Sequence, residues 1–326
     1  MPGMQIRLSN PRGFCAGVKM AINVVDEILD AIGKDSSLYV YHEIVHNLHV
    51  VNRLRDKGAI FVESIAEIPE TSVVVFSAHG VSPEIKKQAM DRSLICIDAT
   101  CPLVTKVHAE AIRYAKRGWQ IILIGHRDHQ EVAGTYGQAP DAIQIVETPE
   151  DIENLHIIDP EALVYLTQTT LSIDDADVII KALKESFPAI HSPPSDDICY
   201  ATTNRQIAVR DEAPAVDLVL VVGSQNSSNS VRLTEISKSA GTPSCLVDDV
   251  SMLQPDWFVD VQDLLITAGA SAPERLVTEI IDHLIAYFDG ELVDESPVNE
   301  GVSFSMPASF NQFMQNNDVT VEGNSQ

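Results

Sequence analysis

Basic residues are scarce in this chain of 326 residues. It has 22 Lys and Arg against 47 Asp and Glu, which gives a formal net charge of −25 and a pI near 4.6. Nucleic-acid backbones and anionic membrane surfaces attract positively charged proteins. The charge balance therefore argues against nucleic acid and against a membrane as partners.

Long apolar runs are also missing. A run such as residues 218–222 is far shorter than the roughly 20 residues that a membrane-spanning helix needs. Residues 1–10 lack the basic and then apolar pattern of an export signal. We expect a cytoplasmic protein.

Cysteines are few, and their number is odd. The five cysteines are spread over a long chain without an export signal, so structural disulfides are not expected. Their thiols are expected to be reduced and available to bind metal.

A repeated unit fills most of the chain: a short apolar run, a turn of small polar residues, and then a helical pattern. Continuous apolar runs predict strands buried on both faces, and their alternation with helices predicts parallel sheets of the α/β class. The predicted strands are residues 38–41, 73–76, 121–124, 163–166, 218–222 and 264–266. Ligands of such sheets bind beyond the carboxyl ends of the strands, where helix N-termini attract anions. The polar turns therefore predict the site.

Three cysteines divide the chain into thirds. Cys15, Cys101 and Cys199 each precede a helical pattern. The expected lobes are residues 16–100, 101–198 and 199–290, with residues 1–15 and 291–310 packed on the last and residues 311–326 a disordered tail. Each third has two strand–turn units, which suggests three similar lobes that each lend one cysteine to a shared centre.

The settings of the cysteines separate them into two groups. Cys96 and Cys245 lie within strand-like runs and are expected to be core residues. The other three lie ahead of helices, where free backbone amides favour a thiolate. Three thiolates suit either an iron-sulfur cluster with one open iron or a zinc site, although the CxxC spacing of structural zinc is absent.

Histidines and a carboxylate accompany the polar turns. His46, His79 and His129 lie in or beside them, and Glu131 follows closely on His129. Any one of these histidines is more often an ordinary buried or solvated side chain. Glu131 would be a proton donor if burial raised its pKa.

Eight ordered stretches resemble the family of 4-hydroxy-3-methylbut-2-enyl diphosphate reductases of the non-mevalonate isoprenoid pathway. Residues 10–18 read NPRGFCAGV, like the N-terminal signature of that family. The other stretches are residues 42–47, 76–82, 98–104, 167–172, 196–206, 223–230 and 267–273. The resemblance extends from residue 4 to about residue 307.

The resemblance implies a trefoil of three α/β lobes around a central 4Fe-4S cluster with Cys15, Cys101 and Cys199 as ligands. The fourth iron, without a protein ligand, would bind the allylic hydroxyl of the substrate. Two electrons and two protons would remove that hydroxyl as water, leaving isopentenyl diphosphate and dimethylallyl diphosphate. A ferredoxin or flavodoxin would supply the electrons.

The resemblance also implies roles for residues of the polar turns. Glu131 would deliver a proton, with Thr169 beside the hydroxyl in the same relay. The diphosphate would be held by His46, His79, His129, Ser227, Ser228, Asn229 and Ser271. The chain departs from the family at Gln130, where proline is usual. Glutamine frees a backbone amide and is expected to loosen the turn before Glu131.

Two other functions remain open from the sequence. An iron-sulfur redox sensor or electron carrier would need the three cysteines but would leave the histidines and Glu131 without a task. A zinc hydrolase of phosphate esters would use the same thiols for a different metal. Turnover with a reductant and metal analysis separate these functions from a reductase.

Overall fold

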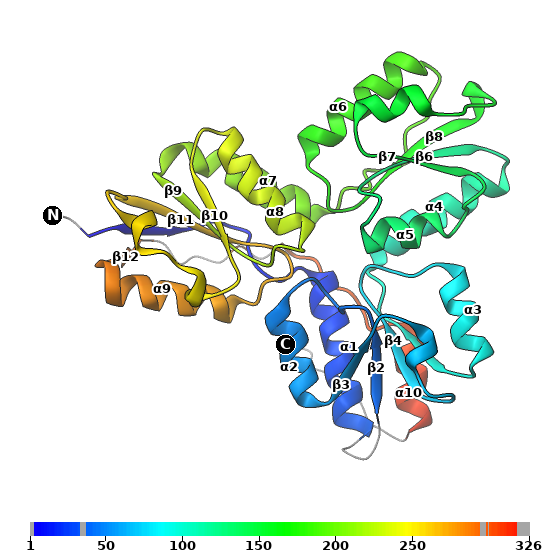
Figure 1. Cartoon of the computed structure of the whole chain (residues 1–326), viewed down its shortest axis with the longest axis horizontal. Coiled ribbons are helices and arrows are strands. Elements are labelled where there is room, and N and C mark those ends of the chain that lie inside the picture. The colour runs from blue at the N-terminus through cyan, green and yellow to red at the C-terminus, as the bar shows by residue number, and fades with distance from the viewer. Residues whose placement is uncertain (1–2, 33–36, 294–297, 299, 318–326) are drawn as a thin grey trace.

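The computed structural model describes residues 3–32, 37–293, 298 and 300–317. These residues form three α/β lobes arranged around a common centre (Figure 1). Each lobe has its own sheet, and every strand pair within the described residues is parallel. The predicted α/β class and three-lobed arrangement are therefore confirmed.

The first lobe has a sheet of four strands in the order β3-β2-β4-β5. Its elements are α1 (Ala16–Ile32), β2 (Leu38–Tyr41), α2 (Leu48–Lys57), β3 (Ala59–Val62), β4 (Val73–Phe76), α3 (Pro83–Asp91) and β5 (Ile95–Asp98). Helix α1 buries one apolar face, including Ile22, Val25 and Ile28, against Val40 and Val75 of the sheet. This packing follows from the spacing of three and four residues between apolar side chains in α1.

The second lobe has three strands in the order β7-β6-β8. Its elements are α4 (Pro102–Lys116), β6 (Gln120–Ile124), α5 (Gln130–Tyr136), β7 (Ile143–Val146), β8 (Leu163–Thr167) and α6 (Ile173–Ser186). Every residue of β8 is buried, as the continuous apolar run predicts. The hydroxyl of Ser172 accepts from the Asp175 amide and caps α6, which fixes where the polar turn ends.

The third lobe has five strands in the order β10-β9-β11-β1-β12. Its elements are β1 (Gln5–Leu8), α7 (Tyr200–Glu212), β9 (Leu218–Val222), α8 (Ser228–Ser239), β10 (Ser244–Val247), β11 (Asp263–Ala268), α9 (Glu274–Phe288) and β12 (Glu291–Leu292). Strand β1 comes from the start of the chain and pairs with both β11 and β12. The third lobe is thus built from both ends of the sequence.

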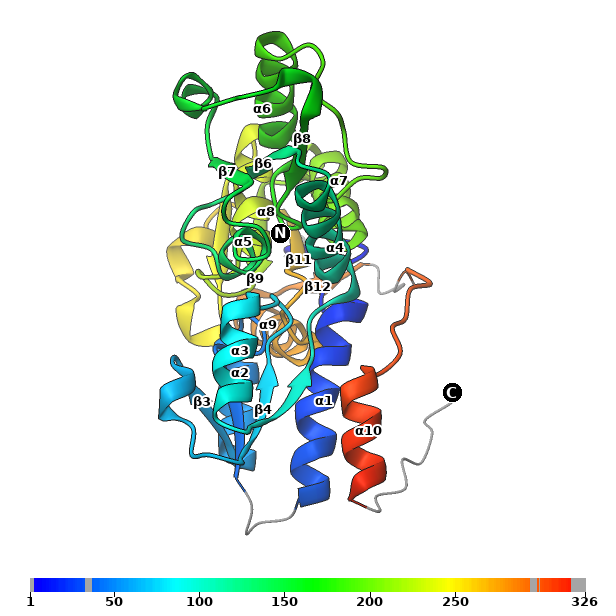
Figure 2. The ribbon, with the colours of Figure 1, turned by 90° about the vertical axis from the view of Figure 1, so that its right-hand side faces the viewer.

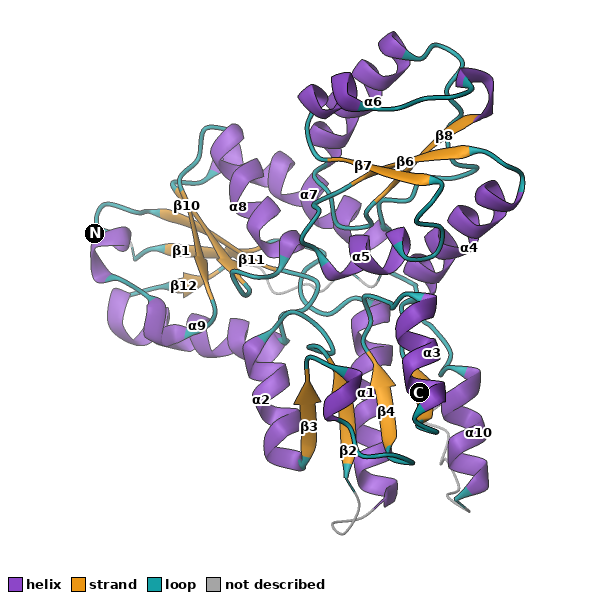
Figure 3. Ribbon diagram, turned by 45° about the vertical axis from the view of Figure 1, so that its right-hand side comes forward, coloured by secondary structure: helices purple, strands orange, loops and turns teal. Residues whose placement is uncertain are grey.

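Helices cover the three sheets, and the polar turns at the carboxyl ends of the strands face the centre (Figure 3). Short 3-10 helices complete the connections: η1 (Ile65–Glu67), η2 (Pro149–Asn154), η3 (Pro160–Ala162), η4 (Ala213–Ala215), η5 (Val250–Met252) and η6 (Pro255–Phe258). Within the part of the chain that the structure describes, no helix combines the length and the apolar character needed to cross a bilayer.

The C-terminal part differs from the expectation. Residues 291–310 were expected on the third lobe, and β12 does lie there, but α10 (Ala308–Asn316) packs beside α1 on the first lobe (Figure 2). Residues 311–316 belong to this helix, so the expected disordered tail is wrong for them; residues 318–326 lie outside the described residues. The physical reason is the apolar stripe of Phe310, Phe313 and Met314, which is buried in the core of the first lobe.

Candidate active site

The polar turns of all three lobes meet at one cavity. They follow β2, β4, β6, β8, β9 and β11, whose carboxyl ends face the centre (Figure 1). Every site residue predicted from the sequence lines this central cavity: Cys15, His46, His79, Cys101, His129, Glu131, Thr169, Cys199, Ser227, Ser228, Asn229 and Ser271. The structure therefore brings these residues together, whereas Cys96 and Cys245 lie in strands β5 and β10.

The three cysteines occupy equivalent positions in a threefold pattern. Each lies just before the first residue of a helix: α1, α4 or α7. Its backbone N–H donates to a carbonyl in the turn after one strand of a lobe. The pairs are Cys15 with Ala270 after β11 at 3.2 Å, Cys101 with Ala78 after β4 at 3.0 Å, and Cys199 with Thr169 after β8 at 3.0 Å. One cysteine is thereby fixed to the inner end of each sheet.

The surroundings of the three thiols are compatible with metal binding. Burial raises the pKa of all three thiols. The pKa of Cys15 is raised, that of Cys101 is raised to about 12, and that of Cys199 is raised to about 11. A buried thiolate needs a nearby positive charge, and a metal deprotonates its thiol ligands. The amide and hydroxyl of Thr202 lie 3.4 Å and 3.1 Å from the Cys199 sulfur as hydrogen-bond partners. At Gly17 an added Cβ would approach the Cys101 sulfur to 2.6 Å, so glycine leaves the room that this sulfur occupies.

The donor groups of the cavity can be compared with those of an iron-sulfur cluster. Such clusters are held by cysteine thiolates, each of which binds its own iron. Cys15, Cys101 and Cys199 bring three thiols to one cavity, so the residues present are of the type that a cluster takes. Over the described ranges of the chain, no three His, Cys, Asp or Glu side chains form a group that could hold a single metal ion.

Three imidazoles form another wall of the cavity. The rings of His46 and His79 stack with centroids 4.1 Å apart, and His129 meets them edge-on at 5.5 Å and 6.0 Å. Burial lowers the pKa of His129 to about 4 and that of His79 well below its usual value. These two rings are therefore neutral hydrogen-bonding groups at physiological pH.

Glu131 and Thr169 form a buried pair on the second lobe. The backbone N–H of Thr169 donates to Glu131 Oε1 at 2.6 Å, and the Thr169 hydroxyl lies 2.9 Å from Oε2. Burial raises the pKa of Glu131 from 4.5 to about 7, although both hydrogen bonds act in the opposite direction. A carboxylic acid with such a pKa can hold a proton and release it near neutral pH.

The third lobe contributes hydroxyl and amide groups. Ser227 caps α8, and the Ser271 hydroxyl donates to the backbone carbonyl of His46 at 2.9 Å. Asn229 is buried, and neither polar atom of its side chain has a hydrogen-bond partner among the described residues. Because buried amides are normally paired, Asn229 is an exception that a bound polar ligand would explain.

Gln130, the departure from the family pattern, begins α5 directly after the cap residue His129. The cap is intact, because His129 Nδ1 accepts from the Glu131 amide at 3.1 Å. The expected loosening of the turn is thus not seen in its hydrogen bonds.

Sequence reasoning missed several residues of the cavity. Thr170 and Thr202 line it beside Thr169 and Cys199, and Gly17 makes room for a sulfur. All three lie within stretches that carry the family resemblance. Their closeness in sequence to predicted site residues could have indicated them. Their contacts, however, depend on how the three lobes pack together.

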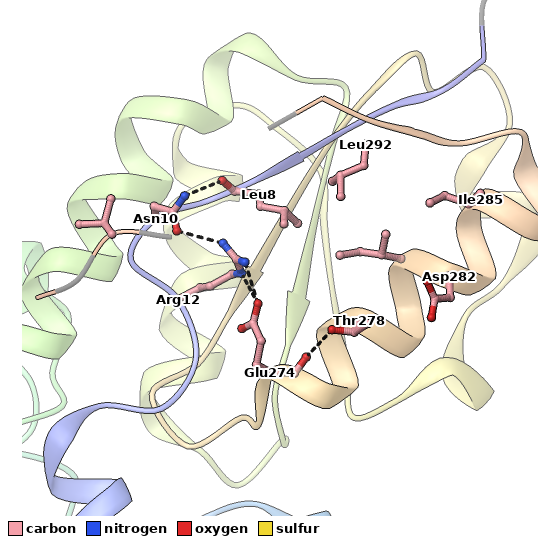
Figure 4. Close-up of a pocket in the computed structure, with 10 residues that line it drawn as sticks. Leu8, Asn10, Arg12, Glu274, Thr278, Asp282, Ile285 and Leu292 are labelled. Carbon is pink, nitrogen blue, oxygen red and sulfur yellow. Dashed lines mark hydrogen bonds and ion pairs between the residues drawn. The ribbon is translucent and has the colours of Figure 1, made fainter. Parts of the chain in front are cut away.

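A larger cavity lies elsewhere, on the third lobe (Figure 4). It measures about 580 Å³, against about 100 Å³ for the central cavity. Arg12 is its cationic side chain, and this guanidinium is already paired with Glu274 at 2.7 Å and bonded to Asn10 at 2.9 Å. None of the predicted site residues lines it, so the chemistry of the lining, and not the volume, identifies the site.

Comparisons with known proteins agree with this arrangement. The family model described as LytB protein matches residues 6–285. A 4-hydroxy-3-methylbut-2-enyl diphosphate reductase of Rhodopirellula baltica is 54% identical over 313 residues, covering 96% of this chain and 98% of that protein. The reductase of Haemophilus influenzae strain PittGG is 52% identical over 307 residues, covering 93% and 97%. The solved structure of the E-1-hydroxy-2-methyl-but-2-enyl-4-diphosphate reductase from Plasmodium falciparum is 38% identical, with a TM-score of 0.91, and covers 98% of this chain and all of that one.

Proposed function

The chain belongs to the LytB family of 4-hydroxy-3-methylbut-2-enyl diphosphate reductases, and on that premise we propose how its central cavity carries out the reaction. The substrate is (E)-4-hydroxy-3-methylbut-2-enyl diphosphate. Two electrons and two protons replace its carbon–oxygen bond with a carbon–hydrogen bond and release the oxygen as water. The products are isopentenyl diphosphate and dimethylallyl diphosphate.

The family implies an iron-sulfur cofactor, and the three cysteines of the cavity are its proposed ligands. Cys15, Cys101 and Cys199 would each hold one iron of a 4Fe-4S cluster, and the fourth iron would have no protein ligand. When bound, the cluster supplies electrons and a Lewis-acidic iron for the hydroxyl oxygen. The space beside Gly17 and the donors around Cys199 support this assignment.

The diphosphate is held by the imidazole wall and by the third lobe. His46, His79 and His129 donate hydrogen bonds from the first and second lobes. On the third lobe, α8 begins at Ser228, and its free N-terminal amides favour an anion. The same turn supplies Ser227, Ser228 and Asn229, and Ser271 lies beside it. The unpartnered amide of Asn229 is the observation that best supports a polar ligand here.

Glu131 and Thr169 deliver the proton that turns the leaving hydroxyl into water. Hydroxide is a poor leaving group, so an acid must stand beside the breaking bond. Glu131 holds a proton because burial raises its pKa to about 7. The Thr169 hydroxyl, 2.9 Å from the Glu131 carboxyl group, passes that proton on.

The electron donor and the location are further parts of the proposal, supported by the family resemblance and the composition. We propose a ferredoxin or a flavodoxin as donor and the cytoplasm as location. Such donors are themselves acidic, so a net charge of −25 requires that docking occurs at a local basic face.

The observation that carries this function is that all twelve predicted residues, from three lobes, line one cavity. The test is turnover of the hydroxylated diphosphate under anaerobic conditions with a chemical reductant. We expect both five-carbon diphosphates as products. A cluster-loaded protein that turns over nothing would indicate a redox sensor or carrier. A colourless protein with zinc and no iron would indicate the zinc hydrolase.

A further inference from the structure

A carboxylate outside the central cavity links its imidazole wall to the third lobe. Glu43 follows β2, and its Oε2 lies 3.1 Å from Nδ1 of His46. The same oxygen accepts from the side-chain amide of Asn226 at 2.8 Å. Asn226 belongs to the turn that continues into Ser227. One oxygen of Glu43 therefore joins a histidine of the first lobe to the polar turn of the third.

His46 differs from the other two imidazoles in this partner. Within the described chain, neither His79 nor His129 forms an ion pair with a carboxylate. Nδ1 of His79 lies 3.3 Å from the Ser77 hydroxyl. Nδ1 of His129 accepts from a backbone amide, so that ring is neutral with its proton on Nε2. An ionised carboxylate can only accept, so the Nδ1 of His46 must carry a proton. His46 is thus the ring of the three that is prepared to become an imidazolium.

The charges around the pair are consistent with this assignment. Glu43 has its pKa lowered, first by the hydrogen bond with His46, against the effect of burial, and further by Arg55 of α2. His42 lies on the same loop, and His79 and His129 face His46 from the neighbouring elements. Because burial keeps His79 and His129 neutral, they add little repulsion to a proton on His46.

We propose that Glu43 is a positioning residue that keeps His46 protonated toward the diphosphate and ties it to the Ser227–Asn229 turn through Asn226. A protonated imidazole makes a charge-assisted hydrogen bond to a phosphate oxygen, about twice as strong as a neutral one. The tether to Asn226 places that charge and the hydroxyl groups of the third lobe on the same ligand. This inference rests on the proposed binding of a diphosphate in the central cavity.

The test measures the binding of inorganic diphosphate to the anaerobically prepared holoenzyme by calorimetry from pH 5.5 to 8.5. Glu43→Gln keeps the shape of the side chain and removes the negative charge that favours a proton on His46. We expect binding about tenfold weaker than wild type at pH 8 and within about twofold at pH 5.5. The absorbance spectrum and iron content should stay those of the wild type.

Two matched variants separate charge from structure. Glu63→Gln removes the carboxylate of the neighbouring His42 pair, which does not line the cavity, and should bind as the wild type does at every pH. Asn226→Ala removes the tether but leaves the Glu43–His46 pair, so its loss should be about two- to threefold and the same at every pH. Should Glu43→Gln not fold, Glu43→Asp decides, because it retains the charge and should retain the pH dependence of the wild type.

If the affinity of Glu43→Gln for inorganic diphosphate changed with pH in parallel with that of the wild type, Glu43 would not act by keeping His46 protonated. This holds whether or not the variant binds more weakly at every pH. The same holds if Glu43→Asp folds and loses the pH dependence. If the wild type itself does not bind inorganic diphosphate at any pH, then the proposed diphosphate site fails, and not this inference alone.

Discussion

At the scale of single residues, burial decides what each group of the cavity can do. The same exclusion of water raises the pKa of Glu131 to about 7 and lowers that of His129 to about 4. An acid that keeps its proton and an imidazole that stays neutral are thereby placed in one cavity. The identity of these residues could be predicted from the sequence, but their protonation could not, because it depends on the packing of three lobes.

Replacement of Glu131 by glutamine tests the proton delivery. The amide has the same shape and cannot donate an acidic proton, so we expect turnover to fall by about 10²–10⁴-fold. Iron content and the affinity for inorganic diphosphate should be unchanged, because Glu131 is assigned to neither. Single-turnover kinetics with a pre-reduced enzyme measures the step directly. Turnover within a few-fold of the wild type would remove Glu131 from the proton path.

The pH dependence of turnover follows from the same group. Glu131 is protonated below a pKa of about 7, so turnover should fall about tenfold per pH unit well above that value. The raised pKa also means that the folded chain gains stability from the proton. That gain is fully present below pH 4.5 and is lost as the pH rises through about 7. Turnover rates measured from pH 6 to 9 check the expected fall in turnover. A turnover rate that stays constant up to pH 9 contradicts it.

Glu43 shows where sequence reasoning ends at this scale. It lies in the stretch of residues 42–47, three residues before His46. Its task depends on a hydrogen bond to His46 and on another to Asn226, 183 residues away along the chain. The spacing of residues in the sequence does not predict a contact between two lobes.

At the scale of elements, continuous apolar runs were sufficient to predict six strands and insufficient for strands that are partly exposed. Predicted strands 38–41, 73–76 and 218–222 coincide with β2, β4 and β9. Strands β3 and β7 lie at the edges of their sheets, and neither is buried along its whole length. A short and partly exposed run resembles a loop in sequence, so these strands were not predicted.

Gly17 in α1 tests how closely the elements around the sulfurs must approach. Alanine would normally stabilise a helix by up to about 1 kcal/mol relative to glycine. Here its Cβ would meet the Cys101 sulfur at 2.6 Å. We therefore expect Gly17→Ala to fold without that gain in stability as the apoprotein and to lose most of its iron and sulfide. Lys19→Ala, at an exposed position of the same helix, should keep both. Full iron content in Gly17→Ala would contradict the assignment of Cys101 as a ligand.

Helix α10 gives a prediction on stability. Phe310 is fully buried in the core of the first lobe, so Phe310→Ala should destabilise the protein by about 3–5 kcal/mol. Gln312→Ala, on the exposed side of the helix, should change stability by less than about 0.5 kcal/mol. Urea unfolding followed by circular dichroism compares the two. Equal midpoints for both variants would mean that α10 does not stabilise the lobe.

At the scale of the whole molecule, α10 was not predicted because the C-terminal part of the chain is polar in composition. Residues 308–316 carry three large apolar side chains at positions 310, 313 and 314, the spacing of one helix face. The pattern was present but short, and its burial depends on a surface that the first lobe provides. The helix was missed because its partner lies some 200 residues or more away in sequence, in α1 and β5.

The threefold arrangement is the property on which the proposed function depends. Each sheet ends in a turn whose carbonyl accepts from the backbone N–H of one cysteine, and these turns bring groups from three lobes to one cavity. A single lobe would hold one thiol and a part of the polar wall. The division of the chain around three cysteines could be predicted from their settings, whereas the way in which the lobes close on one another could not.

Mössbauer spectroscopy of the iron-enriched protein, prepared without oxygen, tests whether three cysteines hold a cluster with one open iron, because it distinguishes irons by their ligands. We expect irons in a ratio of about three to one, with the minority iron alone changing when substrate is added. Four equivalent irons that ignore the substrate, or a protein that binds no cluster, would contradict it.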